Sequence, residues 1–173
     1  MLNKLLLELS PRQPWALVAL ACAGLLGFGV YLQHVVGLEP CPMCIVQRYA
    51  MIGIALVALL AVLRPSGWMG NTLTALGVAL AAGGAFVAAR QSWLQWYPPE
   101  TLSCGRDFYG MVESFPLQRA IPMIFRGGGD CTKIDWTFLG GSIANWSFVA
   151  FVAMALWLLF FAYLRYTQQT QSQ

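Results

Sequence analysis

Five cysteines and one histidine are the side chains of this 173-residue chain best suited to redox or metal chemistry. Cys41 and Cys44 form a tight pair, Cys-Pro-Met-Cys, whereas Cys104 and Cys131 form a wide pair with 26 residues between them. A Cys-x-x-Cys disulfide closes a very small ring, which gains little loop entropy and is often strained. The tight pair therefore favours thiol–disulfide exchange over structural bracing.

Other roles for these cysteines can be weighed from their neighbours. A c-type haem needs histidine directly after the second cysteine, and Ile45 stands there, so haem attachment is excluded. A four-cysteine zinc site remains an alternative, although such sites usually combine two tight pairs. Two inert structural disulfides are the other alternative, on cysteine count alone.

The position of Cys44 predicts a reactive thiolate. If Pro42 occupies the first helical position, Cys41 lies near the N-cap and Cys44 in the first turn. The partial positive charge of a helix N-terminus stabilises a thiolate, and Arg48 lies one turn deeper on the same face. Our hypothesis is that Cys44 has a depressed pKa. Arg48 has a second interpretation, as an interfacial arginine that snorkels to lipid headgroups.

The elements that must position these residues cross a membrane. The chain is 58% hydrophobic and 10% charged, far below the roughly 25% charge of a soluble domain. A helix needs about 20 mostly apolar residues to span the hydrocarbon. We predict an all-α, four-transmembrane-helix bundle forming a single domain over residues 1–173. Its helices are expected at about 15–36, 45–63, 72–89 and 146–164.

Four spans place both termini on one side and the 37–44 turn on the other, together with a long loop at about 90–145. Ten of the seventeen charged residues lie between Arg90 and Asp135. The tight and wide cysteine pairs therefore share one face, which suggests an oxidising compartment such as the bacterial periplasm. Lys and Arg density slightly favours cytoplasmic termini. A net charge of +3 without a long basic block argues against a nucleic-acid partner.

Several smaller features yield expectations of their own. The first apolar segment is too long for a signal peptide, so it should remain as a helix, with Cys22 as a packing residue. His34 has either a polar role in the bundle or a catalytic one. Trp93, Trp96 and Tyr97 should anchor the start of the long loop at the interface. Residues 108–115 have the spacing of a short amphipathic helix, and glycines 127–129 predict a mobile segment.

Motifs spread along most of the chain resemble the DsbB family of bacterial inner-membrane disulfide bond formation proteins. They are Gln33-His34, Pro40-Cys41-Pro42-Met43-Cys44-Ile45, Arg48, Trp93-Leu94-Gln95-Trp96-Tyr97-Pro98, Cys104, Gly129-Asp130-Cys131 and Trp136-Thr137-Phe138-Leu139-Gly140. A Cys-x-x-Cys alone would be a weak signal, but these motifs in this order are specific.

The resemblance implies a thiol:quinone oxidoreductase that oxidises a DsbA-type periplasmic dithiol oxidase. It implies that Cys104 and Cys131 form the disulfide attacked by that partner, at Cys104. Electrons would then pass to Cys41 and Cys44, and from Cys44 to a bound quinone, ubiquinone or menaquinone, beside Arg48. That relay keeps the periplasm oxidising.

Two positions depart from the pattern of some family members. Gln91 stands where some carry histidine, so no catalytic histidine is assigned there, and Gln47 replaces an acidic residue before the arginine.

Two rival functions stay open. One is a vitamin-K-epoxide-reductase-like thiol–quinone enzyme, against which the tight pair at the start of the second helix discriminates. The other is a non-catalytic tetraspan protein braced by two disulfides.

Overall fold

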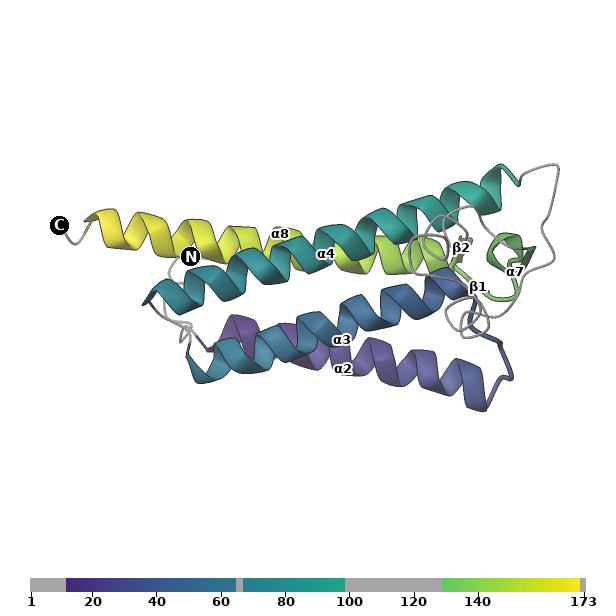
Figure 1. The fold of residues 1–173 in the computed structure, drawn as a ribbon, viewed down its shortest axis with the longest axis horizontal. Helices are drawn as coiled ribbons and strands as arrows, with labels where there is room; N and C mark the ends of the chain where they lie inside the picture. Colours follow the sequence, from purple (N-terminus) through teal and green to yellow (C-terminus); the bar gives the residue numbers. More distant parts are fainter. Residues whose placement is uncertain (1–11, 65–66, 99–128, 172–173) are drawn as a thin grey trace, which may run out of the picture.

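Four long helices lie side by side in the computed structural model, which describes residues 12–64, 67–98 and 129–171 (Figure 1). They are α2 (Gln13–His34), α3 (Pro42–Leu63), α4 (Gly67–Trp96) and α8 (Ile143–Gln171). Each is long and apolar enough to cross a membrane. The predicted all-α four-helix membrane bundle is confirmed.

Three of the four long helices extend beyond the apolar segments from which they were predicted, whereas α2 ends at His34, two residues before its predicted end. The third segment was expected to end at residue 89, but α4 continues to Trp96. Arg90, Gln91 and Ser92 interrupt the apolar run without breaking a helix, since none of them removes a backbone donor as proline does. Trp93 and Trp96, which we expected to open the loop, therefore belong to the last turns of α4.

The core lies along the inside of the bundle, where α4 packs against both α3 and α8 and α2 packs against α3. Small residues let α4 approach its neighbours closely. A Cβ added to Gly84 would lie only 2.4 Å from the Phe151 ring of α8. Cys22 is fully buried in this core with its sulfur 3.6 Å from that of Met154, so its predicted packing role is confirmed.

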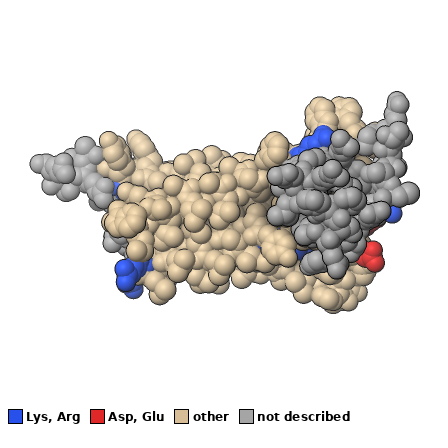
Figure 2. Space-filling model, viewed as in Figure 1, with Lys and Arg blue, Asp and Glu red and all other residues tan. Residues whose placement is uncertain are grey.

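The outer surface of the bundle is apolar. Leu20, Leu56 and Phe86 are among the many large hydrophobic side chains that remain exposed. Figure 2 shows that the middle of one face carries no described acidic or basic residue, whereas charged atoms lie towards the two ends. An apolar belt between charged ends is the surface expected of a protein surrounded by lipid.

A small cap lies at the end of the bundle where α2 leads into α3 (Figure 1). It contains the four-residue helix α7 (Gly129–Thr132) and a hairpin of β1 (Thr137–Phe138) and β2 (Gly141–Ser142). Thr137 pairs with Ser142 and Phe138 with Gly141. Leu139 and Gly140 both have positive φ, 49° and 79°, as the twist of a two-residue hairpin loop requires.

The cap is attached to the long helices by side chains. Trp146 of α8 donates its indole N–H to the carbonyl oxygen of Phe138 at 2.9 Å. Ser142 donates to Gln95 of α4 at 2.6 Å, and the Gln95 amide donates to the Lys133 carbonyl. Cys104, the predicted amphipathic segment 108–115 and glycines 127–128 lie outside the described residues, so the expectations for them stay predictions.

Candidate functional site

The tight cysteine pair lies at the start of α3 with the geometry expected from its sequence. Cys41 is the N-cap, with φ −66° and ψ 159°, and Pro42 is in the first turn. The Cys41 sulfur accepts the backbone N–H of Cys44 at 3.3 Å, as an N-cap side chain does. The two sulfur atoms lie 2.7 Å apart. Only a small movement separates this thiol pair from a disulfide, whose bond is about 2.05 Å long.

Cys131 is brought to the same place by the cap. It lies in α7, fully buried, in a small cluster with Cys41, Met43, Val87 and Leu94. Cys131 is a hydrogen-bond partner of Cys41. The hydrogen bonds to Cys131 and to Cys44, together with burial, raise the pKa of the Cys41 thiol well above its usual value. Three of the four predicted redox cysteines thus meet at one point.

Gln91 of α4 is a further polar residue of the site. Its Nε2 lies 3.2 Å from the sulfur of Cys41 and 3.2 Å from that of Cys44. Its Oε1 accepts a hydrogen bond from Gln47 of α3 at 2.7 Å. Sequence reasoning named both glutamines only as departures from a family pattern. Once α4 is known to continue past residue 89, Gln91 becomes an intramembrane polar residue, which is a recognised signal of function.

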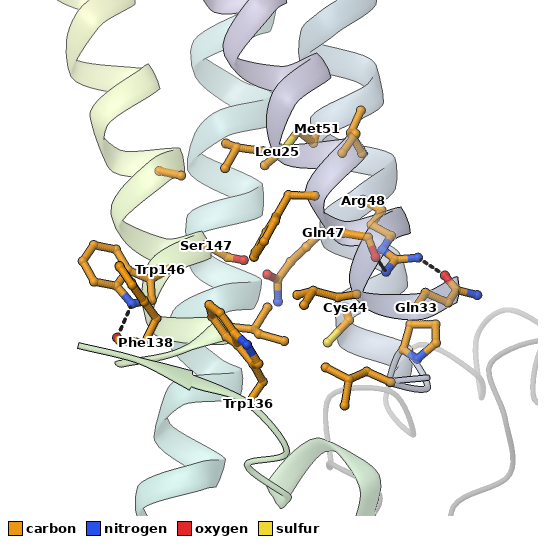
Figure 3. Close-up of a pocket in the computed structure, with 18 of the residues that line it drawn as sticks. Leu25, Gln33, Cys44, Gln47, Arg48, Met51, Trp136, Phe138, Trp146 and Ser147 are labelled. Carbon is orange, nitrogen blue, oxygen red and sulfur yellow. Dashed lines mark hydrogen bonds between the residues drawn. The ribbon is translucent and has the colours of Figure 1, made fainter. Parts of the chain in front are cut away.

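Arg48 turns away from Gln47, because consecutive helical residues point about 100° apart. Its guanidinium donates to the side-chain oxygen of Gln33 at 2.5 Å and to the Gly29 carbonyl at 3.0 Å, both in α2 (Figure 3). These bonds hold the charge against the bundle at the end that carries the cysteines. His34, the last residue of α2, is exposed.

A pocket of about 560 Å³ opens beside Cys44 and Arg48. Its walls come from α2, α3, α8 and the hairpin, and Figure 3 shows Cys44 and Trp136 facing the same space. Aromatic rings form much of one wall: Trp136 lies edge-on to Phe28 at 5.6 Å and stacks on Phe138 at 6.1 Å. The polar exceptions include Gln33, Gln47 and Ser147. An apolar pocket of this size with few polar groups suits a ring-sized organic molecule.

The arrangement has two sides. On one side the sulfur of Cys41 meets the sulfur of Cys131, and on the other Cys44 borders the apolar pocket. Disulfide exchange requires sulfur next to sulfur, and transfer to a small lipophilic acceptor requires a sulfur at a pocket. The tight pair can therefore exchange with a second cysteine on one side and with a bound molecule on the other.

Comparison with known proteins gives a consistent result. Residues 11–161 match the family model described as "Disulfide bond formation protein DsbB". The chain is 68% identical over 154 residues to Disulfide bond formation protein B of Paracidovorax citrulli, covering 88% of this chain and 87% of the relative. It is 69% identical over 146 residues to the same-named protein of a Polaromonas species (84% and 87%) and 54% identical over 154 residues to that of an Azoarcus species (86% and 93%).

Proposed function

The chain belongs to the DsbB family of disulfide bond formation proteins, and from this premise we propose that it is a thiol:quinone oxidoreductase. It oxidises a DsbA-type periplasmic dithiol oxidase and passes the electrons to a membrane quinone. The observation that supports this most strongly is the position of the tight pair, between Cys131 on one side and an apolar pocket on the other.

The first half of the reaction is thiol–disulfide exchange. A thiolate of the partner attacks Cys104 of the Cys104–Cys131 disulfide, and Cys131 leaves as a thiolate. Cys131 lies beside Cys41, so its attack there breaks the Cys41–Cys44 bond and leaves Cys44 as a thiolate at the pocket. Because Cys131 attacks Cys41 directly, its electrons pass to the tight pair and stay within the protein.

Two further exchanges restore the outer disulfide. The partner's second thiol displaces Cys104 and releases the partner in its oxidised form. Cys104 then displaces Cys41 from Cys131, which re-forms the Cys104–Cys131 disulfide. Two electrons and two protons have now moved from the partner to Cys41 and Cys44.

The second half needs an electron acceptor, because exchange between thiols and disulfides is nearly level in free energy. The chemistry that a bound quinone supplies is the uptake of two electrons and two protons, with which the Cys41–Cys44 bond re-forms. The pocket residues fit such a molecule: Phe28, Trp136 and Phe138 would cover an apolar ring, and Arg48 would donate to a carbonyl oxygen. Ubiquinone and menaquinone both satisfy this chemistry.

The same proposal assigns the orientation in the bacterial inner membrane. The start of α2 and the end of α8 lie at one end of the bundle, and the cysteine cluster lies at the other (Figure 1). We propose cytoplasmic termini and periplasmic cysteines, because a partner in an oxidising compartment must reach the wide pair. Cys41 and Cys44 open the second long helix, which favours this family over a vitamin-K-epoxide-reductase-like arrangement.

Trapping of a mixed disulfide tests the proposal against a non-catalytic membrane protein. The oxidised full-length chain is mixed with a DsbA-type partner that retains only its nucleophilic cysteine. The expected product is a covalent complex joined through Cys104, identified by mass spectrometry and absent from the C104S variant. A non-catalytic tetraspan protein would give no complex with either chain.

A further inference from the structure

The two buried glutamines of the site form a single hydrogen-bonded unit. Gln47 and Gln91 expose only 5% and 3% of their surface, yet each has a partner for its amide. Gln91 lies on the same face of α4 as Val87 and Leu94, one turn to either side, and both of these pack against the cysteine cluster. The packing leaves its amide directed at the sulfurs of Cys41 and Cys44.

The Gln47 contact determines which end of the Gln91 amide faces the sulfurs. Gln47 donates through Nε2 to the oxygen of Gln91 at 2.7 Å, which leaves the Gln91 nitrogen 3.2 Å from each of the two sulfurs. The same oxygen also accepts a longer contact, of 3.7 Å, from the Cys44 thiol. The two N–H groups of that nitrogen are then shared between two sulfurs, each 3.2 Å away. Gln47 touches the redox pair only through Gln91 in this network.

An N–H donor discriminates between the oxidation states of sulfur. A thiolate carries full negative charge and accepts strong, charge-assisted hydrogen bonds, whereas a disulfide sulfur is a weak acceptor. The site is also poorly solvated, so a lost donor is not replaced by water at equal strength. Cys44 is the sulfur that the exchange leaves as a thiolate, so a donor fixed 3.2 Å from it stabilises the reduced pair more than the oxidised pair.

We propose that Gln91 is a catalytic residue that shifts the redox equilibrium of Cys41 and Cys44 towards the reduced form, and that Gln47 is the positioning residue that orients it. Both side chains are uncharged, so they supply donors without adding a titrating group to the site. The proposal rests on the proposed function only in requiring that the tight pair is redox-active.

The experiment measures the redox equilibrium of the tight pair without quinone or partner protein. Full-length protein in detergent is equilibrated with mixtures of reduced and oxidised dithiothreitol, quenched with acid and alkylated. Mass spectrometry of the peptide that carries both cysteines then gives its reduced fraction. In the measured reaction the Cys41–Cys44 bond breaks, dithiothreitol closes to its cyclic disulfide, and two electrons and two protons move to the protein.

Gln91→Met keeps the length of the side chain and removes both donors. We expect the equilibrium constant for reduction to fall about tenfold, the loss typical of a hydrogen bond to a charged group. Gln47→Met should lower it less, and should have no further effect in the Gln91→Met protein. Ser92→Ala is the matched control, since Ser92 is the neighbouring buried residue and its hydroxyl has no partner among the described residues.

A Gln91→Met equilibrium constant within twofold of the wild-type value would overturn the proposal. A full additional effect of Gln47→Met in the Gln91→Met background would also overturn the role given to Gln47. Gln91→Glu is a second variant of similar shape whose carboxylate only accepts hydrogen bonds, and it should shift the equilibrium in the same direction. Because no quinone takes part, a shift here with no quinone reduction elsewhere would refute the proposed function and leave this inference standing.

Discussion

Cys131, in a four-residue helix of the cap, is hydrogen-bonded to Cys41, the N-cap of a membrane-spanning helix 90 positions earlier in the chain. The hydrogen bonds that hold the cap against α4 and α8 bring these two cysteines together. This contact joins Cys131 of the predicted wide pair to the tight pair.

A direct consequence is that Cys41 and Cys131 should form a disulfide when Cys44 and Cys104, their proposed disulfide partners, are removed. In the C44S/C104S protein, mild oxidation should convert most of the chain to a Cys41–Cys131 cross-link, detected by peptide mass spectrometry. Cys22 serves as the internal control, because it is buried in the bundle core away from this cluster. Preferential modification of either thiol by the oxidant, without the cross-link, would contradict the observed contact.

The raised pKa of Cys41 predicts an unusual pH dependence of its alkylation. In the reduced protein Cys41 should ionise less between pH 7 and pH 9 than an ordinary cysteine, whose pKa is near 8.5, because its own pKa is raised. Its reaction with iodoacetamide should then rise little over this interval. Cys131→Ala removes the largest cause of the shift, so the midpoint of the pH profile should fall. The midpoint is informative because restricted access of the reagent slows the reaction at every pH without moving the midpoint.

An identical midpoint in the wild-type and Cys131→Ala proteins would show that Cys131 does not raise the pKa of Cys41. Cys131→Ser is the companion variant, since its hydroxyl retains a polar partner at the same place. Its midpoint should lie between those of the other two proteins.

Arg48 is expected to affect the binding of quinone more than the exchange between cysteines. Its guanidinium borders the pocket and is held by Gln33 and Gly29, so it is ready to bind a carbonyl oxygen. Arg48→Met should raise the KM for a soluble quinone about tenfold, as loss of a charged hydrogen bond does. Arg64→Met, at the C-terminal end of α3, is the control. Equal KM values for wild type and Arg48→Met would rule out this contact.

The close approach of α4 to α8 gives a stability prediction that is independent of function. Gly84→Ala places a methyl group in steric overlap with the edge of the Phe151 ring, so the free energy of unfolding should drop by about 1–3 kcal/mol, as in overpacked cores. Gly83→Ala is a matched control, because a Cβ there meets nothing within 4 Å. Unfolding in mixed micelles of increasing denaturing detergent would measure both. Equal stability of the two variants would mean that Phe151 can move aside without cost.

The sequence predicts the bundle and the start of α3 well, for physical reasons. Long uncharged segments can satisfy their backbone groups in lipid only as helices. Pro42 and Cys41 specify a helix start locally, through the fixed φ of proline and the N-cap hydrogen bond. These features depend on neighbouring residues alone, so they are readable from a linear pattern.

The contacts that complete the site depend on distant residues and were not predictable in the same way. Charge counting ended the third helix at residue 89 and so left Gln91 in a loop, although the chain stays helical to Trp96. The approach of Cys131 to Cys41 arises from hydrogen bonds between the cap and two different helices. No periodic pattern in the sequence indicates the Gln47–Gln91 hydrogen bond or the hydrogen bond from Arg48 to Gln33.

The role proposed for Cys44 is tested most directly by the rate of quinone reduction by full-length protein supplied with a reduced DsbA-type partner. Quinone absorbance would be followed in detergent for the wild type, the C44S variant and the C22S variant. We expect rapid reduction by wild type and C22S and at least a hundredfold slower reduction by C44S, as for loss of a nucleophile. Reduction by C44S at the wild-type rate would contradict the claim that Cys44 passes electrons to the quinone.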